Sequence, residues 1–148
     1  MANKYIGDTI RTVDRVPLVD LSRVIAVIVS GSQPCGHMIL NAEKKEGWYF
    51  HVTELKNYPR FMGYEGYKRY LKENDNEELS RIPLELSRPE RALYELDRLL
   101  VLEWPWLPTP EWSCVGFVNR IVSAGGASIY SVCPRKHTVA TDFTPQGH

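Results

Sequence analysis

The chain has 148 residues, of which 43% are hydrophobic and 24% charged, and its formal net charge at pH 7 is zero. This length and apolar fraction predict one globular domain over residues 1–148 with a substantial hydrophobic core. A zero net charge creates no basic field, so we expect no nucleic-acid partner. The longest apolar run, residues 24–29, is too short to cross a bilayer, which predicts no transmembrane segment.

Cysteine usage predicts the compartment. The three cysteines, Cys35, Cys114 and Cys133, lack the C-x-x-C spacing of a zinc site and do not suit a disulfide framework. A reducing compartment is the simplest inference from that usage. Residues 1–8 lack the apolar core of a signal peptide, so we expect a cytoplasmic protein that only an unconventional route would release. We expect no cofactor and no metal, because Cys35 and His37 on one strand face are too few ligands.

The first third of the chain predicts an antiparallel meander. Residues 24–29 are a β-branched run bounded by the turn residues 30–34, which is typical of a buried strand. Residues 35–41 and 48–52 are the predicted second and third strands, with a polar reversal at 42–47 between them. Together the three strands predict a β-sheet at the start of the fold.

Two histidines lie on the two arms of this predicted hairpin. A symmetric loop centred on Lys44 would pair His37 directly with His51. If Gly47 takes a left-handed conformation in a three-residue loop, His51 would instead pair with Asn41. His37 would then lie roughly 13 Å away along the strand. Because side chains alternate with a period of two, both registers keep the two histidines on one face of the sheet.

A helix is predicted over about residues 64–74. One helical face carries Tyr64, Tyr67, Tyr70 and Leu71. These tyrosines would either line a substrate groove or, as such stripes more often do, pack the helix onto a sheet. The acidic residues 74–78 lack the spaced ligands and glycine of an EF-hand, so we expect a solvated loop rather than a calcium site.

Residues 82–86 are predicted to be a short edge strand, followed by a second helix. Ser87 and Glu90 have the spacing of a capping box, and Pro89 is tolerated in a first helical turn. This pattern predicts a helix that is capped by Ser87 and continues to about Leu102.

A third helix is predicted after the rigid, proline-rich segment 104–110. Its apolar face carries Val115, Val118, Ile121 and Val122. Ser113 is the predicted N-cap, and the glycines at 125 and 126 mark the end of the helix. Cys114 would then lie in the first turn, where unpaired N–H groups and the helix dipole lower the pKa of a thiol. Beyond this helix we expect a loop with a short terminal element over 129–137 and a frayed end over 141–148.

Cys114, His37 and His51 supply the parts of a cysteine nucleophile, its general base and the group that orients the base. The imidazole of His37 would take the thiol proton, and His51 would select the tautomer of that imidazole. Backbone N–H groups beside Cys114 would form part of an oxyanion hole. The alternatives are a small, buried, apolar cysteine and ordinary half-buried histidines.

Short motifs around these residues resemble a known family. The S-C-V-G-F-V of residues 113–118 resembles the D-C-S-G-F-V motif at the nucleophile helix of NlpC/P60-type papain-like cysteine peptidases. The G-H-M-I-L of residues 36–40 resembles the strand of that family that carries its base histidine, and His51 matches the third polar residue. The order His, His, Cys is that of the circularly permuted branch, which includes YaeF/YiiX-like proteins and the lecithin:retinol acyltransferase group. Residues 132–136 resemble the proline-containing segment that follows the helix in this branch.

The resemblance implies an α+β fold in which an antiparallel sheet packs against helices and the nucleophile helix follows the sheet. It implies a cysteine hydrolase, with the three catalytic roles given above, acting on an amide such as a peptidoglycan peptide. Thioesterase, acyltransferase and isopeptidase chemistry on the same fold remain open. Three features depart from the family pattern: Val115 after the nucleophile, Trp112-Ser113 before it, and the long insertion at 53–110.

A non-enzymatic interaction module on the same fold is the second hypothesis. Exposed aromatic residues would form its binding surface, since aromatic residues dominate interface energetics. The candidates are Trp104, Trp106, Trp112, Tyr64, Tyr67 and Tyr70. A redox role for Cys35 and Cys133 is a third hypothesis, although no resolving cysteine lies at a telling spacing. Neither the substrate nor the oligomeric state follows from the sequence.

Overall fold

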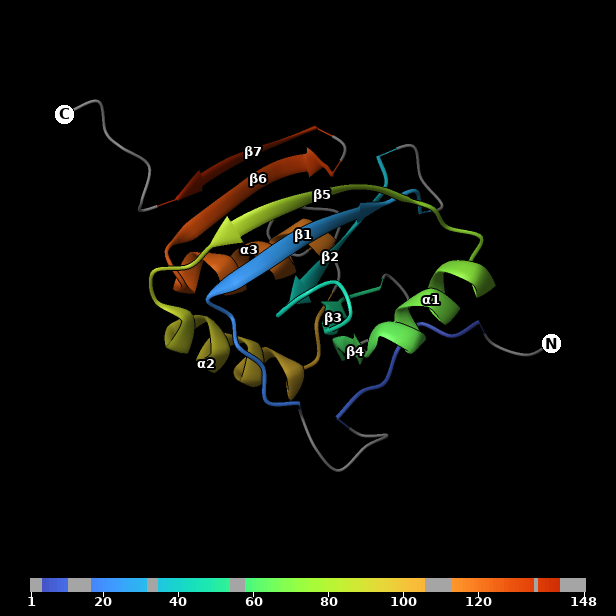
Figure 1. The fold of residues 1–148 in the computed structure, drawn as a ribbon, viewed down its shortest axis with the longest axis horizontal. Helices are drawn as coiled ribbons and strands as arrows, with labels where there is room; N and C mark the ends of the chain where they lie inside the picture. The colour runs from blue at the N-terminus through green and yellow to red at the C-terminus, as the bar shows by residue number, and fades with distance from the viewer. Residues whose placement is uncertain are drawn as a thin grey trace.

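The computed structural model describes residues 4–10, 17–31, 35–53, 58–105, 113–134 and 136–141. Within these ranges the protein is α+β, with three helices, a five-stranded antiparallel sheet and a two-stranded hairpin (Figure 1). The larger sheet has the order β4-β3-β2-β1-β5, and these strands are Arg60–Met62, Trp48–His51, His37–Ala42, Arg23–Val29 and Glu78–Glu85. The helices are α1 (Tyr64–Glu73), α2 (Pro89–Leu100) and α3 (Cys114–Ala124), and the hairpin is β6 (Ala127–Cys133) with β7 (Lys136–Thr141). The predicted α+β class and the β1-β2-β3 meander are confirmed.

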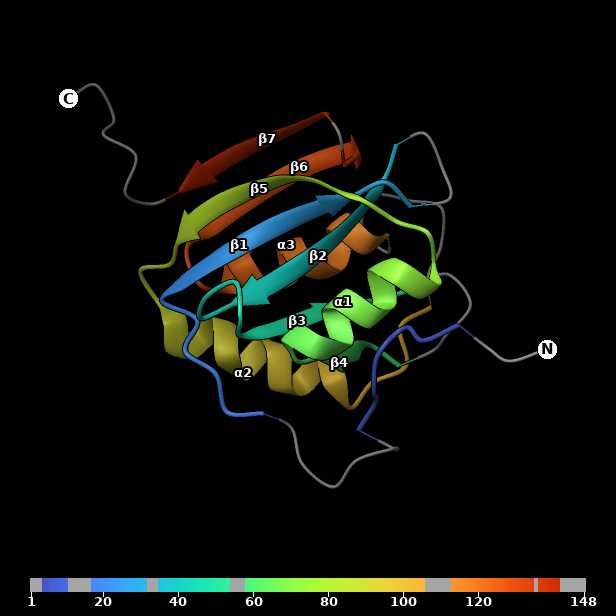
Figure 2. The ribbon, with the colours of Figure 1, turned by 45° about the vertical axis from the view of Figure 1, so that its right-hand side comes forward.

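Helices cover both faces of the larger sheet. α1 lies on one face, and α2 and α3 lie on the other, as Figures 1 and 2 show. Along β2, Met38 and Leu40 pack in the core with α2 and α3, whereas Ile39 between them packs against α1. By the same alternation, His37 and His51 occupy positions that face α1.

The β2–β3 hairpin sets the relation between the two histidines. Ala42 pairs with Trp48, so the loop is centred on Lys45. This register lies midway between the two that the sequence suggested, and neither of those is right. The period of two still places His37 and His51 on one face, as predicted, with their positions offset diagonally across the two strands.

Turn geometry accounts for this register. Glu43 has a φ of 75° and is the left-handed residue of the loop, whereas Gly47 is not among the positive-φ glycines. The assumption that Gly47 takes the left-handed position was therefore wrong. The side-chain amide of Asn41 ties the loop together by donating to the carbonyl oxygens of Lys44 and Trp48, both at 3.0 Å.

A close approach of the backbone explains the glycine at position 47. A Cβ there would collide with the carbonyl oxygen of Ala42 and lie 3.0 Å from that of Lys44. We expect Gly47→Ala to lower the free energy of unfolding by about 1–3 kcal/mol, the usual cost of overpacking, in a denaturant titration. Gly63→Ala is the matched control, because its Cβ would meet only a ring carbon of Trp48 at 3.9 Å. The control should cost less than about 1 kcal/mol, and equal losses in the two variants would contradict the explanation.

Helix α2 begins later than the capping-box pattern predicts. Its first residue is Pro89 and its N-cap is Arg88 rather than Ser87. Proline suits the first helical position because it has no N–H to satisfy, which places Ser87 one residue too early to cap. The Ser87 hydroxyl instead donates to the Gly125 carbonyl oxygen at 3.5 Å, at the end of α3. The predicted capping box is therefore wrong.

Three strand predictions also need correction. β5 is the expected edge strand, but it begins at Glu78 within the segment expected to be a loop, because that part also pairs with β1. β4 was not predicted; it pairs with β3, and a bridge joins Phe61 of β4 to Asp8. β6 and β7 form a hairpin where a loop was expected, and β6 packs against α3. The expected frayed end over 141–148 falls, from residue 142 on, outside the described residues.

Candidate functional site

The two histidines form a direct side-chain hydrogen bond. His37 Nε2 lies 2.8 Å from His51 Nδ1, and the two rings meet edge to face. His51 Nε2 lies 2.9 Å from the carbonyl oxygen of Ile6. His51 is fully buried and His37 is half-buried. A continuous hydrogen-bonded chain thus runs from the segment 4–10 through β3 to the start of β2.

The carbonyl at the end of this chain determines the tautomers of both rings. A carbonyl oxygen only accepts hydrogen bonds, so the Nε2 of His51 must carry its proton. In a neutral ring the Nδ1 of His51 is then a bare acceptor, and His37 must donate to it from Nε2. The nitrogen left without a proton is Nδ1 of His37. His37 is therefore held in the tautomer that can take up a proton at Nδ1.

Both imidazoles are neutral near pH 7. Burial, and then the proximity of His51, lower the pKa of His37 from 6.5 to about 3. Burial lowers the pKa of His51 to about 4, although the hydrogen bond to Ile6 opposes this shift, and the charge of Arg60 adds to it. The tautomer assignment, which requires neutral rings, therefore applies to the resting protein.

Cys114 is the first residue of α3. The hydroxyl of Ser113 caps this helix by accepting a hydrogen bond from the Gly116 amide at 3.2 Å, as the sequence predicts. α3 packs against β2, and the backbone amide of Met38, next to His37 in the chain, lowers the pKa of the Cys114 thiol. The structure thus brings the predicted nucleophile to the start of β2, where His37 is the first residue, while the position of His37 in the strand faces α1.

The Cys114 thiol does not have the lowered pKa that the sequence suggested. Burial raises its pKa above the usual value, although the amides of Met38, Val115 and Cys114 itself lower it. The first helical turn favours a thiolate, but the loss of water around the sulfur outweighs that effect. Within the described residues no hydrogen bond joins this thiol to either imidazole. The resting protein therefore holds a neutral thiol and a neutral imidazole that share no hydrogen bond. In enzymes such a bond often forms only when substrate binds.

Alkylation kinetics should report this protonation state. We expect iodoacetamide to modify Cys114, a free cysteine, at a rate that rises with pH through a pKa above that of a free thiol. The rate near pH 5 should be negligible, because only the thiolate reacts. Mass spectrometry of samples quenched at a series of pH values measures these rates, with glutathione as the reference thiol. A rate that stays constant down to pH 5 would indicate a thiolate–imidazolium pair instead.

Cys35 is disulfide-bonded, whereas Cys114 is a free cysteine. The expectation that the cysteines form no disulfide is therefore wrong at Cys35, and the inference of a reducing compartment loses its basis. Sequence spacing could not reveal the bond, because pairing depends on which segments the fold brings together. The bond also removes Cys35 as a ligand for a metal contact with His37.

Burial excludes three of the aromatic side chains proposed for an exposed binding surface. Tyr67, Tyr70 and Trp104 are 2%, 4% and 3% exposed, so they are part of the hydrophobic core. The tyrosine stripe thus packs α1 onto the sheet. Trp106 and Trp112 lie outside the described residues.

Two groups in contact with the histidines were not predicted as part of the site. The ring of Tyr70 meets that of His51 edge to face, with centroids 5.1 Å apart, and the side-chain amide of Asn76 donates to its hydroxyl. The other group is the Ile6 carbonyl. Helical spacing indicated that Tyr70 faces the sheet but not that it covers His51. A main-chain carbonyl leaves no signal in the sequence.

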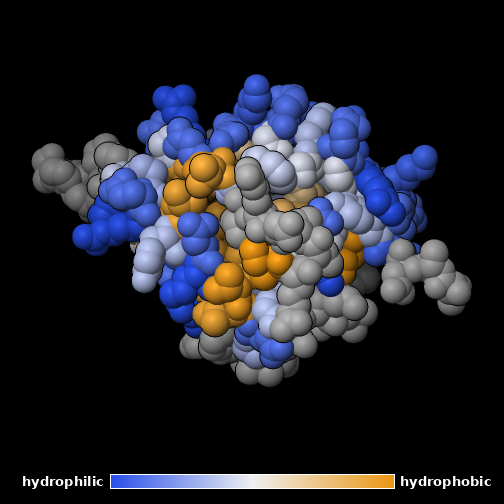
Figure 3. All heavy atoms as spheres, turned by 90° about the horizontal axis from the view of Figure 1, so that it is seen from below, coloured by the Kyte–Doolittle hydropathy of each residue, from blue (hydrophilic) through white to orange (hydrophobic). Residues whose placement is uncertain are grey.

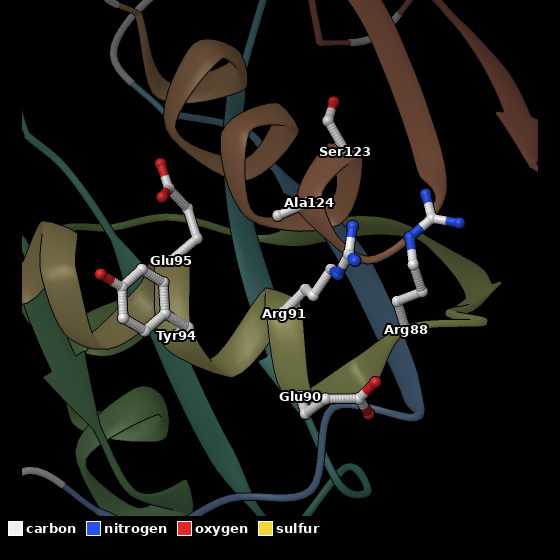
Figure 4. A pocket seen from close by; sticks show the side chains of 7 residues that line it. All are labelled: Arg88, Glu90, Arg91, Tyr94, Glu95, Ser123 and Ala124. Carbon is white, nitrogen blue, oxygen red and sulfur yellow. The ribbon is translucent and has the colours of Figure 1, made fainter.

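A separate pocket of about 430 Å³ lies between α2 and the C-terminal end of α3 (Figure 4). Its lining includes Arg88, Arg91, Glu90 and Glu95, so positive and negative charges are balanced. Cys114 lies at the opposite end of α3, about 15 Å away at the helical rise per residue. The pocket therefore lies away from Cys114, and neither histidine is among its lining residues.

Some large apolar side chains are exposed. Figure 3 shows apolar atoms gathered on the lower face of the molecule, with polar groups between them. Leu18, Val101 and Leu102 are 89%, 52% and 45% exposed. Exposed leucines and valines are common on protein surfaces, so this face alone does not indicate a partner.

Among the described residues, no group of three or more His, Cys, Asp or Glu side chains is placed to hold a metal ion. No helix in the described ranges has the length and apolar character needed to cross a bilayer.

Comparisons with protein-family models, with curated protein sequences and with solved structures found no match.

Proposed function

We propose that the protein is a cysteine hydrolase of amide or ester carbonyls, built on a permuted papain-like arrangement. The observation that carries this proposal is the hydrogen-bonded chain from Ile6 through His51 to His37, which leaves Nδ1 of His37 free to accept a proton. The position of both histidines on strands that precede the nucleophile helix supports the permuted arrangement. The packing of α3 against β2, with Cys114 at the helix start, supports it further.

In the first half of the reaction, Cys114 Sγ attacks the substrate carbonyl carbon and the thiol proton passes to His37 Nδ1. The tetrahedral intermediate collapses, the bond to the amine or alcohol breaks, and the leaving group takes the proton from His37. The acyl group is then held on Cys114 as a thioester. In the second half, water attacks the thioester while His37 accepts its proton. That proton returns to the departing thiolate, and a carboxylic acid leaves.

Backbone amides supply the charge stabilisation. The N–H groups of Cys114 and Val115 belong to the first turn of α3 and have no acceptor within the helix. These two amides and the Met38 amide from β2 lower the pKa of the Cys114 thiol, so they lie close to the sulfur. Fixed donors beside the nucleophile are suited to the negative charge that develops on sulfur and then on the carbonyl oxygen.

His51 orients the base and stabilises its charged form. When His37 becomes an imidazolium, its Nε2–H still donates to the bare Nδ1 of His51, so the hydrogen bond becomes charge-assisted. His51 itself stays neutral because it is buried. The pair therefore fixes Nδ1 of His37 as the nitrogen that receives the thiol proton.

The substrate class follows from the resemblance rather than from the site. A peptidoglycan-type amide is the first candidate, and isopeptides and thioesters share the same first step. An acyltransferase would differ only in the second step, where another nucleophile replaces water.

The experiment that tests this proposal is acylation by p-nitrophenyl acetate. We expect a burst of p-nitrophenol and an acetyl thioester on Cys114, located by peptide mass spectrometry and removed by hydroxylamine. Acetyl groups found only on lysines would overturn the proposal. A stem peptide of peptidoglycan, an isopeptide and an acyl thioester then separate the substrate classes by which of them is cleaved.

A further inference from the structure

A short segment before β1 contacts His51 of the histidine pair. We call residues 5–8 the strap. At one end the Tyr5 amide donates to Glu73 Oε1 at 2.8 Å, and the Asn74 side-chain amide donates to the Tyr5 carbonyl oxygen at 2.8 Å. At the other end Asp8 and Phe61 exchange two backbone hydrogen bonds at 2.9 and 2.8 Å. The strap is thus anchored to α1 and β4, the elements that flank His51.

Between these anchors the strap presents one carbonyl to the site. The Ile6 carbonyl oxygen accepts from His51 Nε2 at 2.9 Å, while the next carbonyl, of Gly7, accepts from Arg60 Nη1 at 3.0 Å. The two successive carbonyls therefore have separate partners. The orientation of the peptide between Ile6 and Gly7 decides whether His51 meets an acceptor.

The histidine pair has two possible hydrogen-bonding directions. If His51 carried its proton on Nδ1, it would donate to Nε2 of His37, and the proton of His37 would move to Nδ1. His37 would then have no free nitrogen for the Cys114 proton. In that state the bare Nε2 of His51 would also face the Ile6 carbonyl, so two acceptors would lie against each other. The carbonyl excludes this state.

We infer that the strap is a positioning element of the proposed catalytic base: its Ile6 carbonyl selects the tautomer of His51 and, through His51, keeps Nδ1 of His37 unprotonated. This inference rests on the proposed function for its catalytic meaning, but the tautomer selection itself does not depend on any activity. The protein thereby uses a main-chain group, far from both Cys114 and His37 in sequence, to fix which nitrogen of His37 accepts the proton.

Gly7 makes the inference testable in the full chain. It has a φ of +110°, and a Cβ there would lie 3.0 Å from both Arg60 Cβ and Met62 Cγ. An alanine cannot hold this conformation without strain. Because φ of residue 7 is the rotation next to the peptide between Ile6 and Gly7, relief of that strain turns the Ile6 carbonyl away from His51. Gly63→Ala is the matched control, since Gly63 has a φ of −76° and more open surroundings.

The measurement is the protonation pattern of the two imidazoles, read by long-range ¹H–¹⁵N NMR correlation on ¹⁵N-histidine-labelled protein near pH 7. In the wild type and in Gly63→Ala we expect His37 and His51 each to be protonated at Nε2 and bare at Nδ1. In Gly7→Ala we expect mixed tautomers for both rings and a loss of about tenfold or more in the acylation rate constant with p-nitrophenyl acetate. Wild-type His51 protonated at Nδ1, or unchanged tautomers in Gly7→Ala, would overturn the inference.

A second variant covers the case in which Gly7→Ala does not fold. Asp8→Pro removes the amide that donates to the Phe61 carbonyl oxygen and so loosens one anchor of the strap. We expect the same mixing of tautomers, and unchanged tautomers in the folded variant would contradict the role of the strap. If the tautomers respond as expected but Cys114 is never acylated, the proposed function fails while the tautomer selection stands.

Discussion

Cys114→Ala is expected to abolish the burst of p-nitrophenol, because the variant has no nucleophile for the first step. His37→Asn should lower the acylation rate constant by roughly 10²–10⁴-fold, the usual contribution of a general base. Stopped-flow absorbance measures the rate constant, and intact-protein mass spectrometry measures the thioester. A wild-type burst in either variant would contradict the assigned roles.

The variants should also show that the two residues act as a unit. The residual rate constant of the double variant should equal that of Cys114→Ala, since without the thiol there is no proton for the base to accept. Ser123→Ala, at an exposed position at the other end of α3, is the control within the same helix and should leave the rate unchanged. Both catalytic variants should melt within a few degrees of the wild type, so that a lost burst cannot be attributed to unfolding.

Local signals were sufficient for the elements that frame the site. The β-branched run of β1 and the Ser113 cap of α3 depend on residues close together in the chain, and both were predictable. The start of α2 was not predictable, because two local signals conflicted: Pro89 takes the first helical position, so Arg88 and not Ser87 is the N-cap. β4 and the β6–β7 hairpin are held by partners from elsewhere in the fold, which a window of sequence does not contain.

The site likewise contains features that local sequence predicts and features that only the fold determines. The strand period predicts that His37 and His51 share a face. This prediction holds in each of the registers considered, because they differ from one another by steps of two residues. Their hydrogen bond depended on the loop being centred on Lys45, which the sequence left open between two other registers. The Ile6 carbonyl could not be predicted, because any residue carries a carbonyl and only the fold brings this one to His51. The raised pKa of Cys114 likewise follows from burial, which outweighs the local effect of the helix start.

Lowering the pH from about 6.5 to about 5 is expected to destabilise the folded protein, because both histidines of the site are held neutral by burial. Their pKa values in the folded protein are about 3 for His37 and about 4 for His51, against 6.5 for an unperturbed histidine. The unfolded chain therefore binds protons at these two side chains that the folded chain does not. The stabilisation is fully present above about pH 6.5 and is lost as the pH falls toward the folded pKa values.

Each such histidine lowers the free energy of unfolding by at most about 1.4 kcal/mol for each pH unit of acidification. The pair therefore sets an upper limit of about 3 kcal/mol per pH unit on this slope. Urea titrations at constant ionic strength between about pH 7 and pH 5 measure this slope, and His37→Asn should remove about half of it. Carboxylates such as Glu73, whose pKa is lowered by the hydrogen bond from Arg69, lose their charge mainly below this window. A free energy of unfolding that does not change across the window would mean that the imidazoles charge freely in the folded protein. The neutral tautomer chain, and with it the bare Nδ1 of His37 on which the proposed mechanism depends, would then be wrong.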